Sequence, residues 1–130
     1  MLGEARLAAV VPISDRQGTI DFYTGTLGLK EIERVGFDAV FEAGGGALLG
    51  AYVTDYAGQA GHTLAGFMVD DLDAAMAELR SRGVTFEEYD LPHLKTVDGI
   101  AEIEGERGAW FKDPDGNILA IGEPADGPRE

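Results

Sequence analysis

The apolar residues of this chain follow two different periods, and each period predicts its own kind of element. Two stretches carry apolar residues at intervals of three and four positions, which is the spacing along one face of a helix. Asp15 and Asp71 stand where these helices would begin, and Ser14 and Gln17 have the spacing of a capping box. We therefore expect two amphipathic helices, with apolar faces formed by Ile20, Tyr23 and Leu27 in the first and by Leu72, Ala75, Met76 and Leu79 in the second.

The other apolar residues stand in short stretches separated by glycine, which predicts strands joined by tight turns. The first two open at Ala8 and Thr63, and the others are residues 30–35, 39–43, 47–54, 85–89, 108–112 and 117–122, with one more within 99–105. The acidic sequence KDPDGNILAI lacks the frame of a calcium loop and contains typical turn residues, so we expect a hairpin there. The sequence GGG at 44–46 predicts a hairpin loop as well, because no helix start follows it.

The order of the predicted elements repeats once along the chain: a strand, a helix and then three strands. Gly28 and Gly83 follow the two helices at equivalent places. This order predicts an α+β fold in which residues 1–130 form a single domain of two similar modules, at about 5–56 and 62–123. The sequence GEPADGPRE at the end is rich in glycine, proline and charge, and we expect a short flexible tail there.

Composition restricts the classes of partner. The chain has 24 acidic residues against 10 Lys and Arg, a formal charge of −14. Such a charge repels phosphate backbones and anionic lipids, which argues against nucleic acid and membranes. It would favour a cationic ligand, but acidic surfaces more often serve solubility, and we expect that role for most of these charges. No apolar run is long enough to span a membrane, the N-terminal residues lack the apolar core of a secretory signal, and there is no cysteine. We therefore expect a cytoplasmic protein.

Three stretches, in the same order as in a known family, resemble the vicinal oxygen chelate superfamily. They read ISDRQGTIDFYTGTLGLK, VDDLDAAMAELRSRGV and WFKDPDGNILAI. This superfamily includes glyoxalase I, extradiol dioxygenases and bleomycin-resistance proteins. The resemblance implies paired βαβββ modules whose curved mixed sheets enclose a cavity, and usually a homodimer with sites built from both subunits. In the enzymes, four side chains from these sheets hold a divalent metal ion.

The four positions that match these metal ligands lack donor atoms. They carry Ala8, Gly50, Leu64 and Ala120. Hydrocarbon side chains have no lone pair for zinc, nickel, iron or manganese, and a shift of one residue along any of the strands supplies no histidine or acid. We therefore predict no metal, no other cofactor and no catalytic residue, as in the metal-free, drug-binding branch that the chain resembles.

Strand alternation also predicts which side chains face the cavity. It places Ala9, Val11, Ile13, Phe67, Val69, Phe111 and Leu119 against the helices. The expected ligand-binding residues are Val10, Leu48, Tyr52, His62, Leu64, Met68, Trp110, Ile118 and Ala120. Tyr52 and Trp110 offer aromatic faces to a planar guest, although both residues would equally serve to fill the sheet interior. We expect a homodimeric, metal-independent protein that sequesters an aromatic or hydrophobic molecule, such as an antibiotic, for resistance or self-protection.

Two other classes of function stay open on the sequence. A lyase or isomerase of the same superfamily, with a shifted or absent metal site, would use His62 or His93 with Glu42, Glu102 or Glu104. His62 stands two positions before Leu64, so we expect it on the same strand face, nearer the end of the strand. An interaction module would use the fold without a small ligand and would need a large exposed apolar patch. Sequestration ranks first because the two histidines have no fixed spacing.

Overall fold

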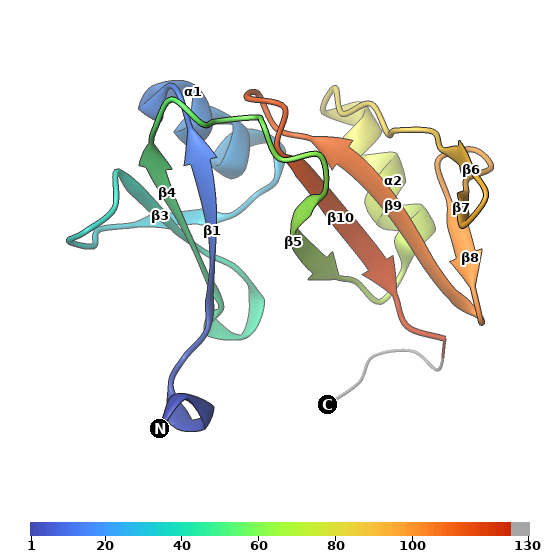
Figure 1. The fold of residues 1–130 in the computed structure, drawn as a ribbon, viewed down its shortest axis with the longest axis horizontal. Helices are drawn as coiled ribbons and strands as arrows, with labels where there is room; N and C mark the ends of the chain where they lie inside the picture. Colours follow the sequence, from blue (N-terminus) through green and yellow to red (C-terminus); the bar gives the residue numbers. More distant parts are fainter. Residues whose placement is uncertain (126–130) are drawn as a thin grey trace.

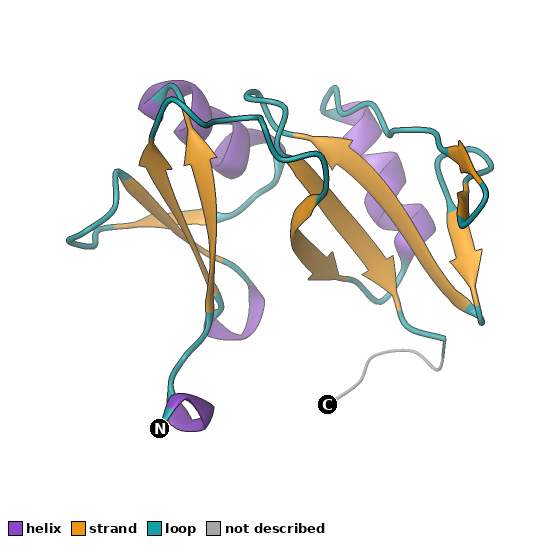
Figure 2. Cartoon of the chain, in the orientation of Figure 1, coloured by secondary structure: helices purple, strands orange, loops and turns teal. Residues whose placement is uncertain are grey.

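Two four-stranded mixed sheets lie side by side, and helices cover one face of each (Figures 1 and 2). The structure is a computed structural model, and it describes residues 1–125. The first sheet has the order β1-β4-β3-β2 and consists of β1 (Ala8–Ile13), β2 (Lys30–Ile32), β3 (Ala39–Glu42) and β4 (Leu48–Val53). The second has the order β5-β10-β9-β8 and consists of β5 (Thr63–Met68), β8 (Ala101–Ile103), β9 (Glu106–Lys112) and β10 (Ile118–Glu123).

This arrangement confirms the predicted α+β fold class. Each sheet pairs its first and last strands in parallel, β1 with β4 and β5 with β10, and its remaining neighbours are antiparallel. The edge strands β1 and β5 lie next to each other where the two sheets meet (Figure 1). The division into modules at 5–56 and 62–123 within one domain stays a prediction.

Aspartate side chains begin both helices. The first helix is α1 (Arg16–Ile20), which continues as a π-helical segment η2 (Asp21–Thr26), and the second is α2 (Leu72–Ser81). Asp15 accepts a hydrogen bond from the Gly18 amide at 3.1 Å, and Asp71 accepts one from the Ala74 amide at 3.0 Å. The predicted capping box is wrong, because the Ser14 hydroxyl donates to Asp115 in the β9–β10 turn instead.

The hairpin predicted at KDPDGNILAI is confirmed, since β9 and β10 pair antiparallel across it. The three glycines between β3 and β4 form the short turn η3 (Gly44–Gly46), as expected of a hairpin loop. One further turn, η1 (Leu2–Glu4), precedes β1.

The strand predicted at 85–89 is wrong. Only Phe86 pairs there, with Phe111, and the chain then forms a small hairpin of β6 (Asp90–Leu91) and β7 (Leu94–Lys95). The Tyr89 amide donates to the Thr96 hydroxyl at 2.8 Å, and the Gly99 amide donates to Glu88 at 3.0 Å. The Thr96 amide also donates to the Tyr89 carbonyl oxygen, so Thr96 occupies both backbone groups of Tyr89, whereas the Glu87 amide still donates to the Trp110 carbonyl oxygen of β9.

The helix-covered faces of both sheets share one hydrophobic core. Val11 and Ile13 from β1 are fully buried in it, as are Phe111 from β9 and Leu119 from β10. Tyr23, Leu72 and Met76 fill the same core from the helices. Because both helices pack into this single core, the two faces that carry no helix lie together on the opposite side of the molecule. In Figure 1, α2 lies behind β9 and β10.

The chain end differs from its prediction at Glu123. This residue, expected in a flexible tail, belongs to β10, as does Gly122, which the predicted strand at 117–122 and the predicted tail had in common. The Glu123 carboxylate accepts a hydrogen bond from the Leu72 amide at 2.9 Å, so it supports the start of α2. The rest of the tail prediction falls largely on residues 126–130, which lie outside the described part of the chain. Within residues 1–125, no helix is long and apolar enough to cross a membrane.

Candidate functional site

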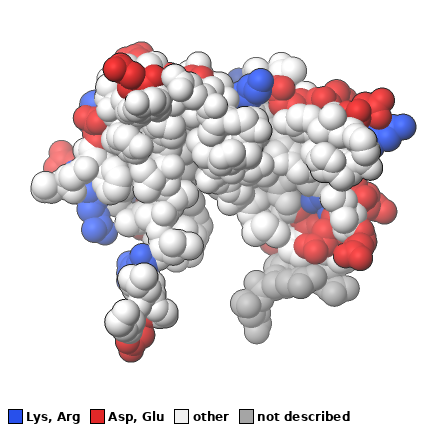
Figure 3. Space-filling view, viewed as in Figure 1, with Lys and Arg blue, Asp and Glu red and all other residues white. Residues whose placement is uncertain are grey.

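The two faces without a helix, called the helix-free face from here on, expose large apolar side chains. Val10 on β1 is 40% exposed, Tyr52 on β4 is 44% exposed and Met68 on β5 is 68% exposed. Val11, Ala51 and Phe67, which stand next to them along the strands, pack into the core, so the alternation of the strands puts these three on the opposite side. In the view of Figure 3, uncharged surface extends over β1, β4 and β5, and acidic side chains gather towards the rim.

The positions that match the superfamily's metal ligands do not fit a metal ion. Ala8, Gly50 and Ala120 stand at strand positions of the helix-free face and carry no donor atom. Phe37, from the loop between β2 and β3, also covers Gly50: a Cβ atom added there would lie 2.9 Å from the Phe37 ring. Among residues 1–125, no three histidine or acidic side chains gather where they would hold a metal ion.

The fourth of these positions, Leu64, has a different environment from the one expected. The register between β5 and β10 shifts at this point, because Thr63 pairs with Ile118 and Ala65 with Leu119. Leu64 is therefore the extra residue of a β-bulge, which changes the direction of a side chain. It is half-buried and packs against the core.

Three of the predicted ligand-binding residues meet at the junction of β1 and β5. Val10, Leu48 and Leu64 line one cavity there, with a volume of about 520 Å³. Its other walls are also apolar and come from Leu7, Ala8, Ala9, Ala43, Ala47, Leu49, Ala65, Gly66 and Phe67. This cavity, called the seam cavity below, has the size and the lining that are typical of small-molecule sites.

Trp110 and Tyr52 do not lie together within one chain. Trp110 is on β9 and Tyr52 is on β4, with β1, β5 and β10 between them. Three hydrogen-bonded strand spacings, about 14 Å in total, and the junction between the two sheets separate them, so the two rings do not stack together on one small planar guest. The alternation of residues along each strand does not predict this separation, because it depends on the order of the strands across the two sheets.

Tyr89 is a neighbour of Trp110 that the sequence analysis missed. The two rings meet edge to face, with centroids 5.7 Å apart and an interplanar angle of 85°. Partial burial and the negative charge of Glu87 raise the pKa of the Tyr89 hydroxyl above its ordinary value. Tyr89 ends the strand predicted at 85–89, which does not form, so the alternation of that strand did not place its side chain.

The remaining predicted ligand-binding residues divide into two groups. Ile118 and Ala120 are half-buried on β10, and Ala120 pairs with Trp110. His62, which was expected to share the strand face of Leu64, lies in the bend before β5 and is exposed, with Nδ1 3.1 Å from the Thr63 carbonyl oxygen. The expectation that His62 lies on the strand is therefore wrong.

The residues named for the alternative enzyme function are scattered. His93 is exposed in the turn between β6 and β7. Glu42 ends β3, Glu102 lies in β8, and Glu104 stands in the turn after β8 with a positive φ of 53°. No two of these side chains share a hydrogen bond among those found within residues 1–125.

Residues 6–121 match the sequence profile of the Glyoxalase/Bleomycin resistance protein/Dioxygenase superfamily. The chain belongs to this superfamily. The match spans both sheets and both helices, and it confirms the resemblance that the three sequence stretches suggested. No curated protein sequence matches the chain.

Solved structures of the superfamily share this fold. A superfamily member from Sphaerobacter thermophilus aligns with a TM-score of 0.69 at 22% identity, covering 95% of this chain and 100% of that one. TnmS3, an antibiotic binding protein from Streptomyces sp. CB03234, aligns with a TM-score of 0.63 at 23% identity, covering 93% and 98%. UcmS2 aligns with a TM-score of 0.71 at 17% identity, covering 92% and 98%. At these identities the likeness concerns the fold.

Proposed function

We propose that this protein binds an aromatic or hydrophobic small molecule on its helix-free face, without a metal ion, and sequesters it unchanged. One observation carries the proposal: the positions where superfamily enzymes hold their metal are hydrocarbon, and the surrounding face is apolar and open. The seam cavity of about 520 Å³ adjoins that face, because Ala8 and Val10 belong to both, and it supplies a preformed concave site. An antibiotic is the ligand class we favour, because TnmS3, which shares the fold, is an antibiotic binding protein.

The proposed active form is a homodimer. Val10, Tyr52 and Met68 leave a broad apolar surface open to water in a single chain, and burial of such a surface favours association. A second copy facing this surface would also bring the partner's aromatic residues towards Tyr52, which lies too far from Trp110 in its own chain. The guest would then lie between the two copies.

The charge of the chain narrows the proposed ligand. With a formal charge of −14, the protein attracts cations, and the acidic side chains lie around an uncharged centre in Figure 3. A planar aromatic molecule that carries an amine matches both features. We further propose a cytoplasmic location, since the sequence contains no cysteine and needs no oxidising compartment to fold.

Calorimetric titration tests this function. Daunomycin, a planar anthraquinone with an amine, and metal-free bleomycin are titrated into chelator-treated protein. We expect saturable binding of at least one probe, weakened by about twofold to tenfold in Trp110→Ala, because an aromatic contact contributes about 0.5–1.5 kcal/mol. Trp110→Phe, the matched control, retains most of the affinity.

Two results would overturn the proposal. One is binding that requires added zinc, nickel, manganese or iron. The other is a chemical change in the bound probe, detected by mass spectrometry of the recovered ligand, which would favour a lyase or isomerase.

A further inference from the structure

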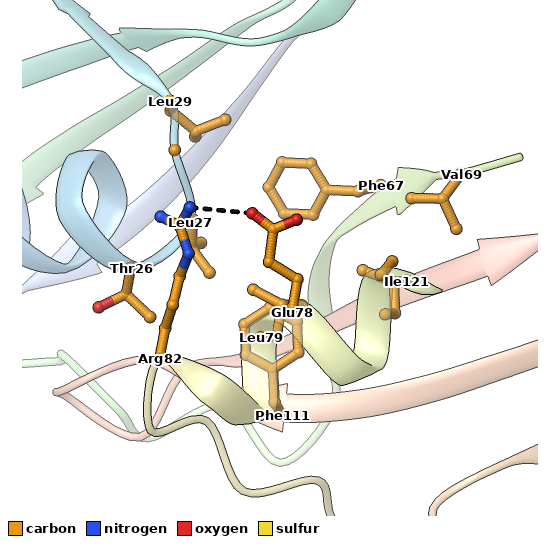
Figure 4. A pocket seen from close by; sticks show the side chains of 12 residues that line it. Thr26, Leu27, Leu29, Phe67, Val69, Glu78, Leu79, Arg82, Phe111 and Ile121 are labelled. Atoms are coloured by element: carbon orange, nitrogen blue, oxygen red, sulfur yellow. Dashed lines mark hydrogen bonds and ion pairs between the residues drawn. The ribbon is translucent and has the colours of Figure 1, made fainter. Parts of the chain in front are cut away.

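A second cavity lies on the other side of the second sheet, under α2 (Figure 4). It has a volume of about 460 Å³ and lies between α2, the end of the first helix and the strands β5, β9 and β10. Phe67 and Ile121 line it, and these alternate along their strands with Met68 and Ala120 of the helix-free face. Phe67 also lines the seam cavity, so the two cavities are neighbours, but the other residues that line the helix-side cavity belong to it alone.

The walls of the helix-side cavity are largely apolar and belong to the core. Phe111 at its base is fully buried, and Ile121 is almost fully buried. Leu27, Phe67 and Leu79 complete the walls and are themselves only partly buried. The cavity is partly open to water, so an apolar guest that enters it removes these partly buried side chains from water, which favours binding.

Arg82 stands at the edge of the helix-side cavity and joins the two helices. Its Nη1 donates to the Gly25 carbonyl oxygen at 2.9 Å, and its Nη2 donates to Glu78 at 2.9 Å, as Figure 4 shows for the second bond. A guanidinium group has five N–H donors, and these two bonds use two of them. Arg82 therefore retains donors for a hydrogen-bond acceptor on a guest.

The charges around the helix-side cavity select an uncharged guest. Glu78 already balances the charge of Arg82, and the chain as a whole carries −14, so an anion gains little there. A cation would lose its hydration against apolar walls without a free carboxylate to pair with. We propose that the helix-side cavity is a second binding site, for an uncharged, mainly apolar molecule with one carbonyl-type acceptor that Arg82 binds.

Fluorescence titration with prodan tests this proposal, since prodan is an uncharged naphthalene with one carbonyl group and an emission that reports its environment. Ala75 lines the cavity from α2, and Ala77 is exposed on the same helix. Ala75→Phe fills the cavity, and we expect it to weaken prodan binding at least tenfold. Ala77→Phe is the matched control and keeps the affinity of the unmodified protein. Thermal melts verify that both variants fold. If Ala75→Phe does not fold, the smaller substitutions Ala75→Leu and Ala77→Leu are compared instead.

Two further variants separate this site from the helix-free face and test the role of Arg82. Trp110→Ala changes only the helix-free face, so prodan affinity stays the same. Arg82→Met weakens the binding of prodan by about threefold to tenfold. The same variant binds 2-(dimethylamino)naphthalene, which lacks the carbonyl group, with unchanged affinity. Equal affinities in Ala75→Phe and Ala77→Phe, no prodan binding by the unmodified protein, or a loss in Trp110→Ala equal to that in Ala75→Phe would each overturn the proposal. None of these outcomes depends on whether daunomycin or bleomycin binds.

Discussion

The Tyr23 hydroxyl donates a hydrogen bond to the Asp113 carboxylate at 2.7 Å, across 90 positions of sequence. Tyr23 comes from the first helix, and Asp113 begins the turn between β9 and β10. The same carboxylate accepts hydrogen bonds from the amides of Asp115 and Asn117, at 3.0 and 2.9 Å. The acidic turn therefore holds the second sheet to the first helix, and its carboxylate binds protein groups rather than a metal ion.

Tyr23→Phe removes the hydrogen bond to Asp113 while keeping the buried ring. Hydrogen bonds to a charged acceptor contribute about 1.5–3 kcal/mol, and we expect the free energy of unfolding to fall by that amount. Urea unfolding measures the change, and an unaltered dependence on denaturant shows that the folded state is otherwise preserved. A loss below about 0.5 kcal/mol would contradict this role.

Asn117 extends the same network and is fully buried. Its Nδ2 donates to the Pro12 carbonyl oxygen at 2.7 Å, and its Oδ1 accepts from the Gly58 amide at 3.1 Å. Asn117→Ala leaves both backbone groups without this partner, and we expect the free energy of unfolding to fall by about 2–4 kcal/mol. Asp115→Ala is the control. It loses hydrogen bonds to Ser14 that are exposed to water, and we expect the free energy of unfolding to fall by less than about 1 kcal/mol. Similar losses in the two variants would contradict the account.

Alkaline pH provides a separate test of Tyr23. Burial, together with the negative charge of Asp113, raises the pKa of its hydroxyl far above the ordinary value. The unfolded chain releases this proton near pH 10 while the folded chain keeps it, so the stabilisation is complete below pH 10 and falls as the pH rises further. We expect the stability of the unmodified protein to decline above pH 10 by about 1.4 kcal/mol per pH unit relative to Tyr23→Phe. Parallel curves for the two proteins between pH 9 and 11 would refute this.

Phe37 is expected to contribute to ligand binding rather than to stability. Its ring covers Gly50 on the helix-free face and is 42% exposed. Phe37→Ala removes an aromatic contact of about 0.5–1.5 kcal/mol, so daunomycin affinity falls by about twofold to tenfold while the melting temperature stays within about 2 °C. Val35→Ala, at a fully exposed position of the same loop, changes neither quantity. Unchanged affinity in Phe37→Ala would remove this residue from the site.

Local patterns predicted the two sides of the sheets correctly. Val11, Ile13, Phe111 and Leu119 were expected against the helices because side chains alternate along a strand, and all four are fully buried. The absence of donor atoms at the four metal positions was also visible in the sequence, since it depends only on residue identity and order.

Other features of the site depend on contacts between distant segments. Phe37 comes from a loop, where no period indicates the direction of a side chain, and Tyr89 ends a predicted strand that does not form. Leu64 departs from strict alternation because the register with β10 shifts beside it. The separation of Trp110 from Tyr52 follows from the order of the strands across two sheets. Each of these requires the tertiary arrangement, which a single sequence does not contain.

The methyl groups of two methionines test the central claim most directly. Met68 is 68% exposed on the helix-free face, whereas Met76, on the core side of α2, is 1% exposed. Protein labelled with ¹³C at the methionine methyl groups and treated with chelator is titrated with daunomycin and observed by NMR. We predict a saturable shift of the Met68 signal while the Met76 signal stays in place. A Met68 signal that does not move at saturating daunomycin, or that moves only after a divalent metal is added, would contradict metal-independent binding on the helix-free face.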